Sequence, residues 1–235
     1  MHRDIYGEAL NEYNENGSLK FPLLLHSSYG DIEEMPIDVF FRDEQDFPEL
    51  EFIALSLCDG HVLDVGAGVG SHALYLQDKG FVVTALEISA TACTIMQARG
   101  VHQIINDNFY TLAGQKFDTL LFLMNGIGLA QTVDGFKALL QHAETLLTAD
   151  GQLLFDSSDI SYLYEEYRIR RPDHYFGEIG YQYEYNGLKG APFKWLYLDQ
   201  HKLIQIAHEE NWVVQILFED ENDQFLVRME KRKSS

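Results

Sequence analysis

The sequence predicts a doubly wound α/β fold around a mostly parallel sheet. From His61 onward, short apolar runs alternate with longer amphipathic runs, a pattern typical of β-α-β units. Gly80 and Gly100 each follow an amphipathic run directly, at the position where glycine commonly ends a helix. The chain has 235 residues, of which 46% are hydrophobic, so it can bury the core of one globular domain with a modest elaboration.

Residues 1–59 precede this pattern and are predicted to form an acidic N-terminal cap. Residues 1–60 contain 14 acidic and only 3 basic side chains. A short helix is expected at residues 48–58, because proline suits the first turn of a helix and Glu49 and Glu51 favour its positive end.

Residues 60–158 are predicted to form the core of the fold. We expect strands at 61–65, 81–87, 101–105, 117–124 and 152–156. We expect helices at 71–79, at 90–99 with Ser89 as N-cap, and at 133–147, where apolar side chains recur on one face.

Residues 159–198 are predicted to form an aromatic insertion. Tyrosines alternate with polar residues and lead to a turn signal, Asn186-Gly187, so we expect a β-hairpin that carries Tyr181, Tyr183 and Tyr185. Residues 199–235 are expected to close the main sheet with a helix at 199–210 and strands at 212–218 and 224–229.

Charge and cysteine content disfavour several classes of function. The formal net charge of −20 leaves no broad basic face for nucleic acid and would repel acidic membranes. The two cysteines are too few for a disulfide framework, and neither they nor the histidines show zinc-ligand spacing, so we expect a reducing compartment and no metal. No run approaches the ~20 apolar residues that span a bilayer, so a cytoplasmic protein is expected.

The most informative motif is a strand that leads into three alternating glycines, Gly66, Gly68 and Gly70, and then a helix. Glycines here let the backbone turn sharply and approach a ligand closely. A dinucleotide turn, G-x-G-x-x-G, would place its third glycine at position 71, which is Ser71 here. Asp64 would repel a pyrophosphate but attract an ammonium or sulfonium group, so we expect a ligand that is positively charged near this loop.

Polar residues also follow the next two predicted strands. Glu87 ends the second strand, 21 residues after Gly66, where a carboxylate can accept hydrogen bonds from the vicinal hydroxyls of a ribose. Asp107 and Asn108 follow the third strand and offer an acceptor and an amide to an adenine edge. The ends of these strands lie side by side in such a sheet, so one adenosine could contact all of them.

With these motifs, residues 50–158 resemble the class I S-adenosylmethionine-dependent methyltransferases. The resemblance implies a Rossmann-like, mostly parallel seven-stranded sheet with an antiparallel C-terminal strand, an N-terminal helical cap and an inserted β-hairpin. It also implies that S-adenosyl-L-methionine is the cofactor, that Asp64 holds its amino group, and that Asn125 lies near its methyl group. The full set of residues implied to bind the cofactor is Asp64, Gly66, Ala67, Gly68, Gly70, Glu87, Ile88, Asp107, Asn108 and Asn125.

The resemblance implies methyl transfer to a nitrogen, oxygen or sulfur atom of an acceptor. The Pro-Pro-aromatic motif of enzymes that methylate base amino groups is absent after the fourth strand, which favours a small-molecule or protein acceptor over nucleic acid. Asp156, Asp159 and His174 are candidate bases, but none is selected as catalytic. An NAD(P)-dependent oxidoreductase and a non-catalytic module that binds an adenosyl ligand are the alternatives.

Several residues also have simpler interpretations. Asp107 could be only the N-cap of a short helix, and Asn125 could only turn the chain. His72 is expected to be a surface histidine and Arg42 to pair with Asp38 or Asp46, although each could reach the cofactor. The aromatic insertion could form a wall over the acceptor, or it could pack on the sheet or make a homodimer interface.

Overall fold

A seven-stranded sheet, the main sheet, forms the centre of the computed structural model, which describes residues 3–30, 32–165 and 169–233. Its strand order is β11-β12-β7-β6-β3-β4-β5. The five strands β3 to β7 are parallel, and β12 pairs antiparallel with both β7 and β11. The bounds are β3 His61–Val65, β4 Val82–Glu87, β5 Ile104–Asn106, β6 Phe117–Phe122, β7 Leu147–Ser158, β11 Trp212–Glu219 and β12 Gln224–Lys231.

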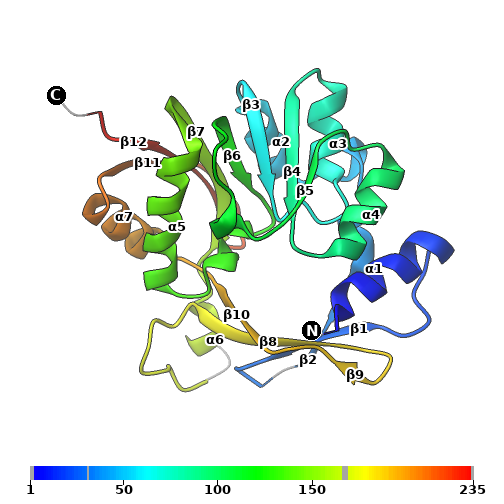
Figure 1. Ribbon diagram of the computed structural model, residues 1–235. Helices are drawn as coiled ribbons and strands as arrows, with labels where there is room; N and C mark the ends of the chain where they lie inside the picture. The colour runs from blue at the N-terminus through cyan, green and yellow to red at the C-terminus, as the bar shows by residue number, and fades with distance from the viewer. Residues whose placement is uncertain (1–2, 31, 166–168, 234–235) are drawn as a thin grey trace.

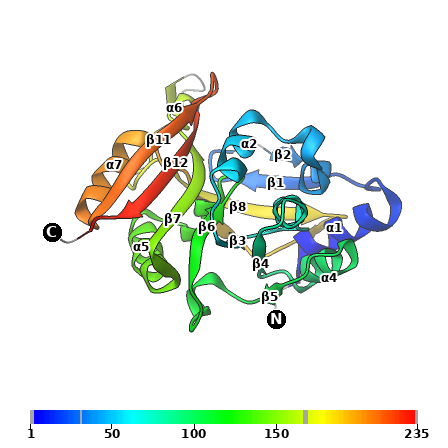
Figure 2. The same ribbon diagram turned by 90° about the horizontal axis from the view of Figure 1, so that it is seen from above.

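Helices cover both faces of the main sheet, as Figure 2 shows from above. One face packs against α5 (Val133–Leu146) and α7 (Gln200–Glu209). The other packs against α2 (Glu49–Ser56), α3 (Ser71–Asp78) and α4 (Ala90–Arg99). Within the described part of the chain, no helix combines the length and apolar character needed to cross a membrane.

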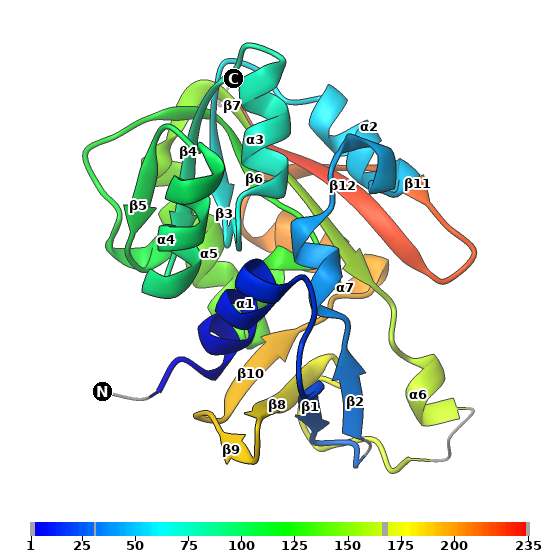
Figure 3. The same ribbon diagram turned by 90° about the vertical axis from the view of Figure 1, so that its right-hand side faces the viewer.

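A second sheet, the small sheet, joins the N-terminal segment to the aromatic insertion. Strand β8 (Glu178–Tyr185) pairs antiparallel with β10 (Phe193–Leu196), β9 (Leu188–Lys189) and β1 (Leu23–Ser27), and β1 pairs with β2 (Ile32–Met35). This sheet lies across the carboxyl ends of the parallel strands (Figure 1). Helix α1 (Ile5–Asn16) lies beside it and packs against α4, whereas α6 (Tyr162–Glu165) follows β7 (Figure 3).

The predicted order of core strands and helices is confirmed, although several boundaries differ from those predicted. Val101 is not in a strand, because its amide donates to the Met96 carbonyl at 3.1 Å and so closes α4. Leu147 begins β7 instead of ending the preceding helix, because it pairs with Phe117. Residues 123–124 lie beyond the end of β6, and Met124 has a φ of +57° that a strand does not allow.

The predicted hairpin is present in β8 and β10, but the sequence prediction did not include α1, β1 or β2. The N-terminal cap therefore contains strands as well as helices, because it supplies β1 and β2 to the small sheet, which also contains β8, β9 and β10 of the insertion. These strands bring residues more than 150 positions apart into register, for example His26 and Gln182.

Candidate functional site

The glycine turn between β3 and α3 is fixed against the neighbouring strand. The amides of Gly66 and Ala67 donate to the Leu86 carbonyl at 2.9 and 3.1 Å. Gly66 has a φ of +72° and Gly68 a φ of +55°, values that favour glycine. A Cβ on Gly66 would meet no atom within 4 Å, so the turn borders open space here.

The third glycine serves helix packing. A Cβ on Gly70 would lie 2.7 Å from Val101 Cγ2 and 3.0 Å from Met96 Cγ. The missing side chain therefore lets α3 begin close to α4. Of the three glycines expected to wrap the cofactor, Gly70 has its nearest side chains too close to leave room for a Cβ.

Glu87 ends β4 directly beside the turn. Its Oε2 accepts the Gly68 amide at 3.0 Å, and its Oε1 accepts the Ser89 amide at 2.8 Å. Burial raises the pKa of Glu87, although these two amides favour its charged form. Each carboxylate oxygen has a further acceptor position, so Glu87 can also accept ribose hydroxyls. The next residue, Ile88, is 71% exposed and offers an apolar surface beside the carboxylate.

Asp107 follows β5 and is exposed at the same edge of the main sheet. Its Oδ1 accepts the Thr111 hydroxyl at 2.8 Å and the Asn108 amide at 2.7 Å, and both bonds lower the pKa of Asp107. The N-cap of the following 3-10 helix, η3 (Phe109–Thr111), is Asn108, whose Oδ1 accepts the Tyr110 amide at 2.9 Å. Asp107 is therefore not the N-cap, and the Asn108 amide is used within the loop.

Asp64 lies in β3, two residues before the first glycine of the turn, and is almost fully buried. Its Oδ2 has no hydrogen-bond partner among the described residues. Burial raises the pKa of Asp64 to about 6, and the nearby His72 opposes this shift. A buried acceptor without a partner is costly, so a bound donor of positive charge would be favourable here.

His72 and Arg42 meet on one carboxylate, that of Glu51 in α2. His72 Nε2 lies 2.8 Å from Glu51 Oε2, and Arg42 Nη2 lies 2.6 Å from Glu51 Oε1. Burial opposes ionisation of Glu51, but His72 and then Arg42 outweigh it and lower its pKa. The expectation of a surface His72 was wrong, because α2 covers it, and Arg42 pairs with Glu51 rather than with Asp38 or Asp46.

Asn125, which follows β6, connects the main sheet to the small sheet. Its side-chain Nδ2 donates to the Leu196 carbonyl at 3.1 Å, and its carbonyl accepts Trp195 Nε1 at 3.1 Å. Its φ is +54°, and its buried Oδ1 has no partner within the part of the chain that the structure describes. Asn125 therefore turns the chain and hydrogen-bonds to β10, and its Oδ1 can still accept a hydrogen bond.

The three candidate bases have different surroundings. Asp156 Oδ2 accepts the Asn125 amide at 2.8 Å and the Gln224 side-chain amide at 2.9 Å, and burial raises the pKa of Asp156 to about 6. Asp159 Oδ1 accepts the Ser161 amide at 2.8 Å, and His174 is exposed. Asp156 thus positions Asn125, and the geometry selects no base.

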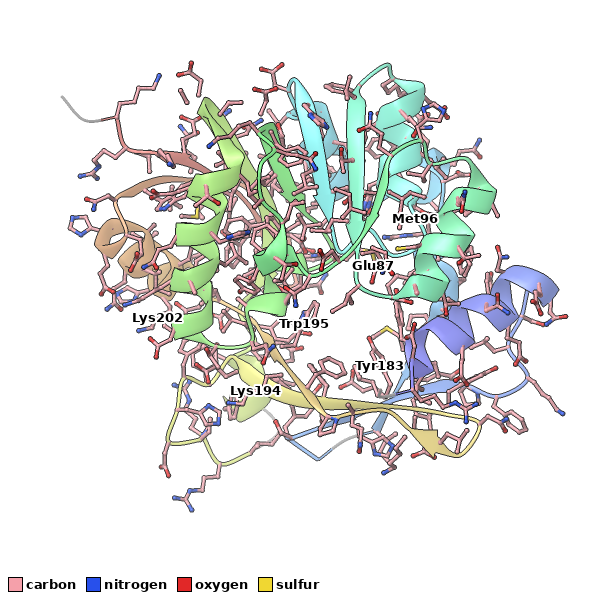
Figure 4. All side chains as sticks on the ribbon, viewed as in Figure 1. Glu87, Met96, Tyr183, Lys194, Trp195 and Lys202 are labelled. Carbon is pink, nitrogen blue, oxygen red and sulfur yellow. The ribbon has the colours of Figure 1, made fainter. Side chains whose placement is uncertain are left out.

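Aromatic residues from distant segments cover the glycine turn. A Cβ on Gly68 would lie 3.6 Å from the Tyr6 hydroxyl and 3.8 Å from Phe40 Cδ1. The Tyr6 ring stacks on Tyr183 of β8, with centroids 5.7 Å apart. Figure 4 shows Tyr183 and Trp195 on the side of the small sheet that faces Glu87. Sequence reasoning singled out neither Tyr6 nor Phe40, because only the unpredicted α1 brings Tyr6 to the turn.

These features fit S-adenosylmethionine in three respects. Glu87 lies where the ribose hydroxyls are expected, the space at Gly66 admits close approach of a ligand, and the unpartnered Asp64 oxygen suits the cationic methionine end.

Comparison with known proteins gives a consistent result. A family model described as a methyltransferase domain matches residues 63–155. A putative methyltransferase of Geobacillus sp. (strain WCH70) is 30% identical over 101 residues, which are 40% of this chain and 41% of that relative's length.

Solved structures cover more of the chain. A SAM-dependent methyltransferase from Bacteroides fragilis, crystallised with S-adenosyl-L-homocysteine, is 33% identical, with a TM-score of 0.88 and coverage of 98% of this chain and 95% of that chain. The CcbJ methyltransferase from Streptomyces caelestis shares the fold at 15% identity, with a TM-score of 0.62 and coverage of 80% and 94%.

Proposed function

Because the chain belongs to the S-adenosylmethionine-dependent methyltransferase family, we propose that it methylates a nitrogen, oxygen or sulfur atom of a small-molecule acceptor. The acceptor atom attacks the methyl carbon, the bond from that carbon to the sulfonium sulfur breaks, and S-adenosylhomocysteine leaves. The sulfonium is already an activated leaving group, so the protein mainly has to align the two reactants and exclude water.

The observation that carries this proposal is the position of Glu87 beside the glycine turn, with its carboxylate held by two backbone amides. In the proposed complex Glu87 binds the ribose hydroxyls and Ile88 packs against the adenine. Asp107 accepts from the adenine amino group and Asp64 attracts the methionine ammonium. Asn125 Oδ1 lies toward the transferred methyl group.

A small-molecule acceptor is supported by charge and by the cover over the site. The net charge of −20 disfavours polyanionic acceptors, and the small sheet crosses the carboxyl ends of the parallel strands. The described cysteines, Cys58 and Cys93, are both buried and free, which supports a reducing, cytoplasmic location.

Thermal unfolding with and without ligand tests the proposal. S-adenosylhomocysteine is expected to raise the unfolding temperature, whereas NADH is expected to leave it unchanged, because only a ligand that binds the folded state stabilises it. A shift with NADH and none with the adenosyl ligand would contradict the proposal. Labelled S-adenosylmethionine incubated with acceptor classes then identifies the methylated atom.

A further inference from the structure

A cavity lies on the face of the small sheet that carries Tyr181 and Tyr183, the face turned toward the proposed cofactor site. Its volume is about 440 Å³, and its lining is mostly aromatic, with one carboxylate, that of Glu33. The lining residues are Tyr29, Glu33, Ile160, Tyr162, Leu163, Tyr181 and Tyr197.

Strand register explains why Glu33 lines this cavity. Glu33 of β2 lies opposite Leu25 of β1, and Leu25 lies opposite Tyr183 of β8. Residues directly opposite each other point to the same face, so these three side chains share one face of the small sheet. Glu34 is on the opposite face because side chains alternate along a strand.

Four tyrosines surround the cavity, and three of them form a connected group with Glu33. The Tyr29 and Tyr181 rings meet edge to face, with centroids 6.4 Å apart, and the Tyr181 and Tyr197 hydroxyls are 3.4 Å apart. The Tyr29 hydroxyl donates to Glu33. Burial raises the pKa of all three hydroxyls, so they stay neutral near pH 7.

A continuous row of rings leads from this cavity toward the proposed cofactor site. Phe193 lies between the cavity and Tyr183, with its centroid 6.0 Å from Tyr181 and 5.2 Å from Tyr183. Tyr183 in turn stacks on Tyr6 over the glycine turn. Three successive ring contacts therefore connect the cavity to the glycine turn, so an acceptor anchored in the cavity can extend along this row toward the cofactor.

We call the four tyrosines that line the cavity the tyrosine cage. We propose that this cage, together with Glu33, binds an ammonium group of the methyl acceptor and so anchors the acceptor. None of the lining residues within the described part of the chain is cationic. Tyrosine faces attract cations through the negative potential of the ring, and a nearby carboxylate adds to this attraction. An anionic acceptor would instead face Glu33 without a positive partner. The inference rests on the proposed methyltransferase function and extends it to the class of substrate.

Calorimetry with matched probes tests the cage. Choline is the cationic probe, and its tert-butyl analogue, in which carbon replaces the charged nitrogen, is the neutral probe of the same shape. With S-adenosylhomocysteine at saturation, choline is expected to bind about tenfold more tightly than the neutral probe. Glu33→Gln is expected to lower the affinity for choline about tenfold and to leave the affinity for the neutral probe unchanged.

Two pairs of variants separate the cage from general effects. Glu34→Gln removes the same charge from the opposite face of β2 and is expected to leave choline binding unchanged. Tyr162, which is 41% exposed, supplies the second pair. Tyr162→Phe keeps the aromatic ring and is expected to keep the affinity for choline, whereas Tyr162→Leu is expected to lower that affinity severalfold. Both variants are expected to have the unfolding temperature of the parent protein.

Equal affinity for the two probes, or equal effects of Glu33→Gln and Glu34→Gln, would overturn the cage. The titration of S-adenosylhomocysteine alone reports separately on the proposed function. If that ligand binds but choline does not, the cage is wrong and the methyltransferase proposal stands. If that ligand does not bind, the proposed function itself fails.

Discussion

Glu87 has two tasks, because the same carboxylate fixes the glycine turn and is proposed to bind the ribose. It accepts the amides of Gly68 and Ser89, so its removal also frees the turn. Glu87→Ala is expected to lower the affinity for S-adenosylhomocysteine by roughly 10 to 100 fold, since hydrogen bonds to a charged group are worth about 1.5 to 3 kcal/mol. Calorimetry measures this loss.

Glu87→Gln provides the control, because it keeps one acceptor oxygen and the side-chain volume. We expect an affinity between those of Glu87→Ala and the parent protein. Unchanged affinity in both variants would show that the adenosine lies elsewhere.

The positions of single residues at the candidate site were largely predictable from the sequence, whereas their roles stay predictions. Asp64, Glu87 and Asp107 follow from their positions at or near the ends of predicted strands. The partners of His72 and Arg42 were not predictable, because both contact Glu51 from segments 21 and 9 residues away, through helix packing rather than local sequence.

At the scale of elements, the small sheet is anchored to the main sheet through Trp195. A Cβ on Gly128, in the 3-10 helix η4 (Gly126–Ala130), would lie only 2.0 Å from Trp195 Nε1. Gly128→Ala is therefore expected to displace β10 and to reduce the free energy of unfolding by about 1 to 3 kcal/mol, the usual cost of overpacking. Urea unfolding measures the change.

Gly180→Ala is a matched control in β8, because a Cβ there would lie 3.4 Å from the nearest Ser28 atom, an ordinary contact. It is expected to be neutral or slightly stabilising. Adding Trp195→Ala to Gly128→Ala should remove most of the overpacking, so additive losses in the double variant would contradict this anchor.

The main sheet could be predicted from the sequence, whereas the small sheet could be predicted only in part. Strands β3 and β4 are apolar and are followed by glycine or N-cap signals, whereas β2 (Ile32–Met35) contains two glutamates and little apolar pattern. Strand β2 pairs with its neighbour β1, and β1 in turn pairs with β8, which lies more than 150 residues further along the chain. No local pattern encodes such a contact, so the N-terminal strands were missed.

At the scale of the whole molecule, buried carboxyls make stability depend on pH. Burial raises the pKa values of Asp64 and Asp156 to about 6, above the ordinary value of 3.8. Their protonated forms favour folding, so this contribution is complete below pH 3.8 and is lost as the pH rises through about 6. The lowered pKa of Glu51 has the opposite sign, but it acts only near and below its ordinary value of 4.5.

The ligand-free protein is therefore expected to lose stability between about pH 5 and about pH 7, and the repulsion within a chain of net charge −20 acts in the same direction. Asp64→Asn removes one buried charge, so it should flatten this slope and raise the free energy of unfolding at about pH 7 by about 1 to 3 kcal/mol. The same variant should bind S-adenosylhomocysteine more weakly, because the methionine ammonium loses its carboxylate. Urea unfolding across this pH range, with and without the ligand, measures both effects. A steeper slope in Asp64→Asn, or tighter ligand binding, would show that Asp64 is neither a destabilising buried charge nor the partner of the ammonium group.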